Sequence, residues 1–389
     1  MAHASGRYGT ALYGDSLYGV NYGEIGLPGV RWDLIALSPQ GEALRDLIGA
    51  TSKKFTFRLN EPSSVEWAMA GDDPGAAVVD ELTTDVEAWR NGVRLFRGRV
   101  GPSGDEVGPT DHRVAFSAAD YRAMLDRRII WADATYTGID QSAIAWDLIA
   151  DAQLIGGMGI TNASTATGVT RDRTYEAGKN LGEAIQQLSE VIGGFDWDIS
   201  PEMGFRTWYP RRGIEADFVA VWGDTVSQVS RQLDPSGYAN AIRFSGADGV
   251  TPTTRQVADL YEPSGEVNPI YPGRFDAQEG DTDITTTAAL GEKADAALAE
   301  RGVIRPSYKV TLMPGVWDGP ATFWLGDICR LIVRRGRLDV DTEARVHEIT
   351  VTDDGNGGET VEVTFDRAPA SVLKRITRDA ARLDRLERR

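Results

Sequence analysis

The 389-residue sequence contains very little cysteine and histidine. Cys329 is its only cysteine, so no disulfide can form within one chain, and a secreted scaffold held together by disulfides is excluded. This cysteine lies in an apolar run (328–333), which predicts a buried thiol in the core. The three histidines, His3, His112 and His347, are far apart and lack the spacings of zinc sites, so we expect no bound metal.

Long apolar runs and an excess of basic residues are also missing. No stretch reaches the roughly 20 apolar residues of a membrane span, and the N-terminus lacks the apolar core of a signal peptide, so we expect neither feature. The 41 Lys and Arg face 58 Asp and Glu, a net charge of −17. Such a surface repels phosphates and excludes a basic nucleic-acid groove as the main function. With 41% hydrophobic residues, the chain is long enough for about two or three folded domains.

The first segment (1–26) repeats a Tyr-Gly pair and has neither helical nor strand periodicity. Glycine at this density opposes regular structure, whereas spaced aromatic side chains offer rigid contact area. Two interpretations stay open: a flexible leader, or an arm that lies on a neighbouring subunit. The candidate interface residues of the arm are Tyr8, Tyr13, Tyr18 and Tyr22.

The next segment (27–135) has the pattern of antiparallel strands, and we expect a first β-barrel-like domain. Apolar and polar residues alternate in 55–59 and again in 65–69, with a turn between them, which predicts a hairpin. Asn91-Gly92 predicts the turn of a second hairpin, because both residues tolerate positive φ. A further strand (113–117) and a short helix (118–125) follow.

Helical spacing appears in the middle of the chain (136–225), which predicts an α+β insertion domain. Apolar residues fall on one face of a helix between 144 and 152, and again between 181 and 192. Asn180 is the expected N-cap of the second helix, with Glu183 three residues further on. A hairpin formed by 195–199 and 205–208 is expected to pack on this helix.

The remaining chain predicts a connecting segment with a strand, a long loop and a helix (226–302). A second β-barrel-like domain (303–366) follows, completed by strands from 226–250. It echoes the first: Asn91-Gly92 followed by Arg99-Val100 resembles Gly336 followed by Arg345-Val346, which suggests two similar β units.

The last segment (367–389) predicts a basic helix, because it holds eight basic and three acidic residues on an otherwise acidic chain. Leu373, Ile376 and Leu383 form an apolar stripe that is too short for a stable isolated helix. We therefore expect the stripe to pack on another protein surface, and these three residues are candidate interface residues.

Catalytic chemistry has little support in the sequence. Neither a complete phosphate-binding loop nor a nucleophile elbow is present, and we expect no cofactor and no enzymatic activity. One alternative stays open: Asp196 and Asp198 point to the same face of a strand, and with Glu202 they could supply carboxylates for cell-wall hydrolysis.

Four stretches together carry a family resemblance: 33–37, 57–67 (FRLNEPSSVEW), 89–100 (WRNGVRLFRGRV) and 119–128 (ADYRAMLDRR). In their order and spacing they resemble the opening domain of siphophage minor tail proteins of the baseplate-hub type, as found in actinobacteriophages. The resemblance is strongest over residues 27–131 and continues more weakly through Asn240 and the final β unit.

The resemblance implies a homotrimer in the virion, at the distal end of a long non-contractile tail, made in the host cytoplasm. Each chain would supply two tube-type domains, so three chains would form a pseudo-sixfold ring. Implied partners are the distal tail protein, the tape measure protein and other minor tail or receptor-binding proteins, with DNA only in transit through an acidic channel. The mainly β fold is therefore expected to form a structural hub; a distal tail protein ring component and a tail-associated hydrolase are the alternatives.

Overall fold

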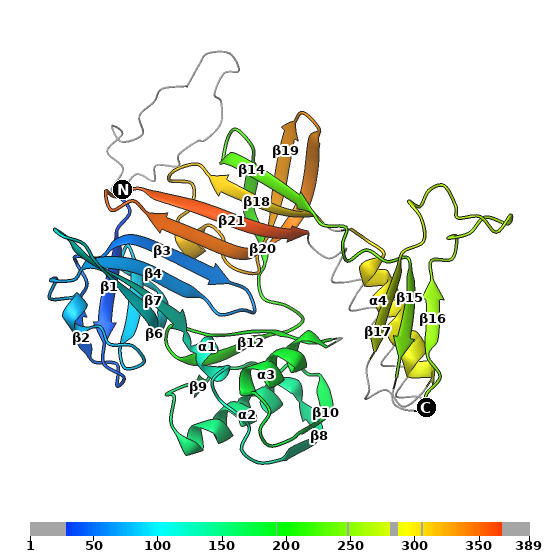
Figure 1. Ribbon diagram of the computed structural model, residues 1–389, viewed down its shortest axis with the longest axis horizontal. Coiled ribbons are helices and arrows are strands. Elements are labelled where there is room, and N and C mark those ends of the chain that lie inside the picture. The colour runs from blue at the N-terminus through cyan, green and yellow to red at the C-terminus, as the bar shows by residue number, and fades with distance from the viewer. Residues whose placement is uncertain (1–28, 192, 247–248, 281–286, 305, 368–389) are drawn as a thin grey trace, which may run out of the picture.

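The computed structural model describes residues 29–191, 193–246, 249–280, 287–304 and 306–367. The fold is mostly β, as the sequence predicts, with a large, mainly antiparallel sheet and few helices (Figure 1). No helix in these ranges is long and apolar enough to cross a membrane. The candidate interface residues lie outside the described ranges: Tyr8, Tyr13, Tyr18, Tyr22, Leu373, Ile376 and Leu383.

The first β unit contains both hairpins that the sequence predicts. Phe55 pairs with Val65 across the first hairpin, and Arg90 pairs with Val93 beside the Asn91-Gly92 turn of the second. Asn91 and Gly92 both have positive φ, as this turn requires. The strands are β1 (Trp32–Leu37), β2 (Ala43–Asp46), β3 (Thr51–Arg58), β4 (Ser64–Ala70), β5 (Asp85–Arg90), β6 (Val93–Val107) and β7 (His112–Asp120).

The insertion spans 121–212 and not the predicted 136–225, because Tyr121 and Leu125 belong to its apolar core and β13 (Glu215–Val221) pairs with a strand of the second β unit. Its core lies beneath the first unit in Figure 1. The side chain of Asn180 accepts a hydrogen bond from the backbone N of Glu183 at 3.0 Å, so the predicted helix cap is confirmed. Helix α3 ends at Glu190, before the predicted end at 192. The elements are α1 (Tyr121–Leu125), β8 (Ala134–Asp140), α2 (Gln141–Ile155), β9 (Thr161–Asn162), β10 (Thr170–Tyr175), α3 (Leu181–Glu190), β11 (Asp196–Ile199) and β12 (Gly204–Trp208).

Helix α1 is shorter than predicted. Residues 118–120 belong to strand β7, because Ala118 and Ala119 pair with both β4 and β6 and Asp120 pairs with β6. Asp120 then caps α1 by accepting a hydrogen bond from the backbone N of Arg122 at 3.1 Å. Because β-sheet hydrogen bonds form on both sides of this segment, it is a strand and not the first turn of the helix.

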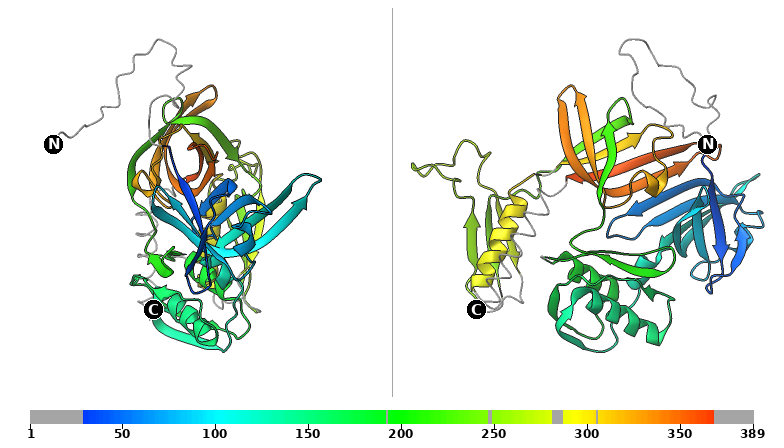
Figure 2. Two further views of the ribbon diagram at one scale, coloured as in Figure 1. Left: turned by 90° about the vertical axis from the view of Figure 1, so that its left-hand side faces the viewer. Right: turned by 180° about the vertical axis from the view of Figure 1, so that it is seen from behind.

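The second β unit curves around a common axis in the left view of Figure 2. In β21, Val361, Val363 and Phe365 are buried, as their alternation predicts. The unit consists of β13 (Glu215–Val221), β14 (Val226–Leu233), β18 (Pro306–Leu312), β19 (Ile328–Arg335), β20 (Leu338–Asp353) and β21 (Glu359–Arg367).

A small appended module (234–304) interrupts the β14–β18 hairpin and lies to one side of the molecule (Figure 1). This corrects two expectations. The segment expected to be a long loop contains β16 (Thr253–Gln256) and β17 (Asp276–Gly280). Strand β15 (Ala241–Ser245) pairs with these two and not with the second unit, so of the strands in 226–250 only β14 completes that unit.

The physical reason for this pairing is the apolar face of β15. Ile242 and Phe244 are buried against Leu290 and Ala294 of helix α4 (Thr287–Arg301). A three-stranded sheet covered by one helix can bury this face, whereas a loop could not. Helix α4 ends at Arg301, and the backbone N of Gly302 donates to the carbonyl of Leu298, close to the predicted end.

The two β units have the same strand order. Numbered within each unit, and leaving out β2, the order across the sheet is 2-3-6-5-4-1: β3-β4-β7-β6-β5-β1 in the first and β14-β18-β21-β20-β19-β13 in the second. The fifth strand of each is long, and its register with the sixth strand shifts just after Val100 in one unit and Val346 in the other. One difference is that β1 runs antiparallel to β5, whereas β13 runs parallel to β19. The similarity suggested by the sequence is therefore present in the topology.

Pairing of β3 with β20 joins the two units into one 13-stranded sheet. Phe55 lies opposite Val351, Phe57 lies opposite Ile349, and all four side chains are buried. A single apolar cluster extends across both units. The join is therefore part of a shared core and not a contact between two closed domains.

Buried ion pairs reinforce this join. Arg90 on β5 donates to Glu359 on β21 through Nη2 at 2.7 Å and Nε at 3.2 Å, and Trp32 Nε1 donates to the same carboxylate at 2.9 Å. The side chains of Arg90 and Glu359 are 5% and 4% exposed. Lys53 on β3 pairs with Asp353 on β20 at 3.0 Å. Each of these charges therefore has a partner of opposite charge on the other β unit.

Removing the carboxylate of Glu359 should strongly destabilise the protein. Glu359→Ala removes the buried carboxylate that Arg90 and the Trp32 indole share and leaves Arg90 with the Trp317 carbonyl and the exposed Asp318 as acceptors; breaking a buried pair typically costs about 3–5 kcal/mol. Asp318→Ala is a matched control, because Asp318 also pairs with Arg90 but is 76% exposed; its loss should cost about 1 kcal/mol or less. Urea unfolding of both variants measures the difference in the free energy of unfolding. Equal losses of stability would show that the buried ion pair does not stabilise the join between the units.

Candidate functional site

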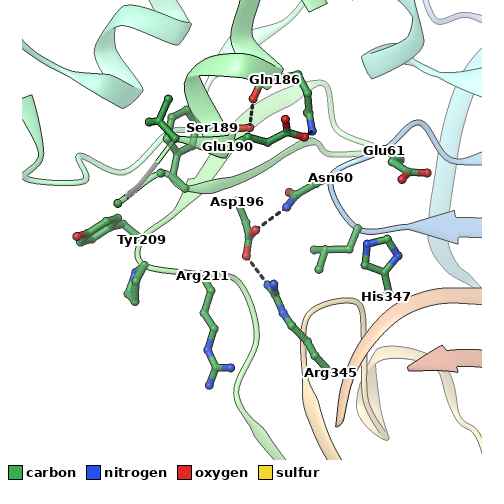
Figure 3. A pocket seen from close by; sticks show the side chains of 16 residues that line it. Asn60, Glu61, Gln186, Ser189, Glu190, Asp196, Tyr209, Arg211, Arg345 and His347 are labelled. Carbon is green, nitrogen blue, oxygen red and sulfur yellow. Dashed lines mark hydrogen bonds and ion pairs between the residues drawn. The ribbon is translucent and has the colours of Figure 1, made fainter. Parts of the chain in front are cut away.

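A polar cleft lies where the insertion meets both β units (Figure 3). Its walls come from the turn after β3, the end of α3, the start of β11, the segment 209–211 and strand β20. These elements are far apart in the sequence and belong to three parts of the fold. Its labelled side chains include Asn60, Glu61, Gln186, Glu190, Asp196, Tyr209, Arg211, Arg345 and His347.

Asp196 stands at the centre of this cleft and is 7% exposed. Its Oδ1 accepts from Asn60 Nδ2 at 2.6 Å, and its Oδ2 accepts from the backbone N of Arg212 at 2.6 Å. The guanidinium of Arg345 also donates to Oδ2. One carboxylate therefore ties together the first β unit, the insertion and the second β unit.

Asn60 reaches Asp196 from a turn whose backbone suits asparagine. Its φ is 57°, in the left-handed region that Asn tolerates better than most residues. Its side-chain Oδ1 also accepts from the backbone N of Trp197 at 3.2 Å. The sequence predicts this turn but not its contact with Asp196, because no local pattern links residues 136 positions apart.

The carboxylates proposed for a hydrolase are all engaged in ion pairs. Asp198 lies on the same face of β11 as Asp196, as expected, and accepts from Arg206 at 2.8 Å and from Arg212 at 2.6 Å. Glu202 pairs with Arg94 at 3.1 Å. Burial tends to raise the pKa of Glu202, but hydrogen bonds from Arg94 and Ser200 outweigh it and hold the pKa below its ordinary value. A general acid needs a raised pKa, so this is the environment of a structural carboxylate.

Arg122 makes a second junction between the first unit and the insertion. Its side chain lies over the ring of Trp197, 3.6 Å from the ring centroid, and donates to the Trp197 carbonyl at 3.0 Å and to Gln186 Oε1. Burial lowers the pKa of Arg122 to about 10, against the opposing effect of nearby carboxylates including Asp120. The guanidinium therefore stays charged at neutral pH, and it stacks on Trp197 through a cation–π contact.

Asp120 links Arg122 to the turn after β3. Its Oδ2 accepts from the backbone N of Ser63 at 2.8 Å, while Oδ1 caps α1. Burial raises the pKa of Asp120 to about 6, although the hydrogen bond from Ser63 and the charge of Arg122 act in the opposite direction. The carboxyl therefore titrates close to neutral pH.

The cysteine and histidines do not form a catalytic or metal site in the part of the chain that the structure describes. Cys329 is buried, as predicted, and burial raises the pKa of its thiol to about 12, which excludes a reactive thiolate. His112 pairs with Asp105 at 2.7 Å, and His347 lines the cleft. Among the described residues, no three His, Cys, Asp or Glu side chains gather as metal ligands. The cleft is thus a polar joint between the three parts of the fold.

The titration of Asp120 should appear in the pH dependence of stability. Its pKa is about 6 in the folded protein and about 4 in the unfolded chain, so the folded state holds the proton more tightly. Its stabilising contribution is complete below about pH 4 and is lost as the pH rises through 6, a change of about 3 kcal/mol. Relative to Asp120→Asn, wild-type stability should fall between about pH 4 and 7. Urea unfolding of both proteins across this range measures it; a constant difference would contradict the assignment.

Comparison with protein families finds a match in the second half of the chain. Residues 221–374 match the family model described as "Prophage endopeptidase tail". This range covers the end of β13, the appended module and the rest of the second β unit. No curated protein matches the chain.

Solved structures of tail proteins share the fold over most of the chain. A tail protein from Neisseria meningitidis MC58 superimposes with a TM-score of 0.64 at 13% identity, covering 86% of this chain and 96% of that one. A 43 kDa tail protein of prophage MuSo2 from Shewanella oneidensis gives 0.63 at 13% identity, with 86% and 98% covered. Prophage tail protein gp18 from Listeria monocytogenes EGD-e gives 0.55 at 12% identity, with 90% and 99% covered. The chain therefore has the fold of phage tail proteins.

Proposed function

We propose that the protein is a structural baseplate hub, a minor tail protein that continues or closes the distal end of a long non-contractile phage tail. The observation that carries this proposal is the repeated strand order: two β units with the same order are joined in one sheet within one chain. Fold similarity to phage tail proteins along nearly their whole length supports the same class of function.

The repeated unit gives a physical reason for a trimeric ring. Closed rings arise when the same interface repeats around an axis. Three chains with two similar units each can match a sixfold tube end, so the proposed assembly is a homotrimer. This ring would face the distal tail protein on one side and tail-tip or receptor-binding proteins on the other, with the tape measure protein in its channel during assembly.

The acidic composition suits a channel for DNA in transit. A net charge of −17 gives like charge between protein and phosphate, which prevents binding along the path. The protein would act in the virion, at the tail tip, without a cofactor. A distal tail protein ring component is a weaker candidate, because it would carry a single tube-type unit, whereas this chain has two units of the same strand order.

A tail-associated hydrolase is the alternative from another functional class. The description of the matched family contains the word endopeptidase. The ion pairs of Asp196, Asp198 and Glu202 argue against a role for these carboxylates in cell-wall cleavage. A zymogram on bacterial cell walls separates the classes, because the hub proposal expects no clearing. Clearing that is lost in the Asp196→Asn, Asp198→Asn or Glu202→Gln variant would support the hydrolase, and clearing that persists in all three would point to another site.

The copy number in the tail tip tests the hub directly. A reconstruction of virions should show three copies in one ring, with the two β units of each chain occupying adjacent, similar positions. Light scattering of the purified protein should approach the mass of a trimer as the concentration rises, because assembly follows mass action. Six copies in a ring would contradict the hub and support the distal ring protein.

A further inference from the structure

The pairing of β3 with β20 is possible because β19 leaves part of one edge of β20 unpaired. We call such a part of a strand edge, which the neighbouring strand does not reach, a half-edge. Strand β19 covers one side of β20 only as far as Arg345, which lies opposite the first residue of β19, Ile328. Beyond Arg345, β19 no longer covers this edge of β20, and residues 348–352 pair there with β3 instead. The fifth strand of the second unit therefore accepts the second strand of the first unit.

The first β unit has the same half-edge on β6, and no strand in the described part of the chain pairs with it. One side chain reaches this edge, since Ser103 Oγ donates a hydrogen bond to the carboxylate of Glu81. Strand β5 covers β6 only as far as Arg99, and residues 103–107 pair with β7 alone. This half of β6 projects clear of the molecule with β7, as the cyan hairpin in the left view of Figure 2. Gly104 has open space where a side chain would lie, and Val107 is 74% exposed. The edge is accessible to another strand.

The strand that would fit this edge is β14, because it is the second strand of the second unit and corresponds to β3. In the sheet β14 pairs only with β18, and most of its residues are exposed. It is eight residues long and contains neither proline nor lysine, the residues that usually protect an edge strand from pairing. Within one chain it cannot reach β6, since six strands separate the two in the sheet.

The ladders of the two units fix the expected register. Gly104 lies as far beyond Arg99 as Thr350 lies beyond Arg345, and Thr350 pairs with Thr56. Starting from Arg99 and from Arg345 and moving from each residue to its paired neighbour across the sheet leads to Thr56 in the first unit and to Gln232 in the second. Gln232 is thus the equivalent of Thr56, so it should lie opposite Gly104. The two series of paired residues are Arg99, Ala119, Ser64, Thr56 and Arg345, Asp366, Ser307, Gln232.

The charges on the two edges are complementary in this register. Arg231 would lie opposite Asp105, and Ser230 opposite Glu106. Arg231 is the only charged residue of β14, and it forms no ion pair with the described residues; β6 carries Asp105 and Glu106 at this edge and no basic residue beyond Arg99. Asp105 is 60% exposed and its described partner is His112. Cross-strand pairs of opposite charge favour antiparallel pairing.

We propose that β14 of one copy adds as an antiparallel strand to residues 102–107 of β6 of a second copy. The contact would repeat between chains the join that β3 and β20 make within one chain, and its head-to-tail character allows a closed ring. The proposal rests on the proposed function, which requires self-assembly, but it names a specific pair of edges that self-assembly alone does not.

Cysteine cross-linking tests the register. In a Cys329→Ser background, Ser230→Cys with Glu106→Cys places two exposed thiols on opposite residues of the proposed pair, within reach of a disulfide. Mild oxidation with oxidised glutathione should give covalent oligomers that dissociate on reduction. The matched control joins Ser230→Cys with Val93→Cys, at the far end of β6, and should remain mostly uncross-linked. Equal cross-linking in both would overturn the proposal.

Charge reversal tests the same contact without oxidation. Arg231→Glu and Asp105→Arg should each raise the dissociation constant of the assembly about tenfold, and the double variant should recover much of that loss. Arg337→Glu, an exposed change in the β19–β20 turn, should leave it unchanged. If trimers form but show neither the cross-link nor any change in dissociation constant with the two charge reversals, the strand pairing would be wrong while the hub proposal would stand. A protein that stays monomeric at millimolar concentration would overturn both.

Discussion

The pairing of β3 with β20 is the interaction on which the rest of the structure depends. It turns two curved sheets into one and lets Phe55, Phe57, Ile349 and Val351 share a single core. Backbone hydrogen bonds supply the direction of the join, and apolar burial supplies most of its free energy. Because the strands of both units are fixed to this ladder, the orientation of one unit relative to the other is set by sheet geometry and not by a flexible linker.

A few charged residues stabilise the join between the β units because they are placed where they can form ion pairs across it. Arg90 and Glu359 are buried between the units, and Lys53 beside them is mostly covered where it meets the buried Asp353, so an unpaired charge at either place would be costly. Asp196 extends the same principle to the insertion, since its carboxylate accepts from both β units and from the segment after β12. Asp196, which first suggests catalysis together with Asp198, therefore connects three parts of the fold.

The repeated strand order also explains where additional parts of the chain are placed. The insertion follows the sixth strand of the first unit, and the appended module opens the hairpin between the second and third strands of the other. In the first unit that hairpin is a short turn carrying Asn60, which contacts Asp196. Additions at hairpin ends leave the ladders intact, so the sheets tolerate them. The same hairpin position thus makes an internal joint in one unit and carries a separate module in the other.

Four local features follow from short stretches of sequence: the Asn91-Gly92 hairpin, the Asn180 cap, the alternation of β21 and the buried thiol of Cys329. Each depends on residues a few positions apart, whose turn, capping or burial preferences are strong enough to be seen without the fold. The order of the strands, the pairing of β15 inside the appended module and the contacts of Asp196 become visible only in the folded chain. Strand pairing uses backbone groups that every residue has, and apolar faces of similar size fit several partners, so the choice among them is made when the whole chain packs.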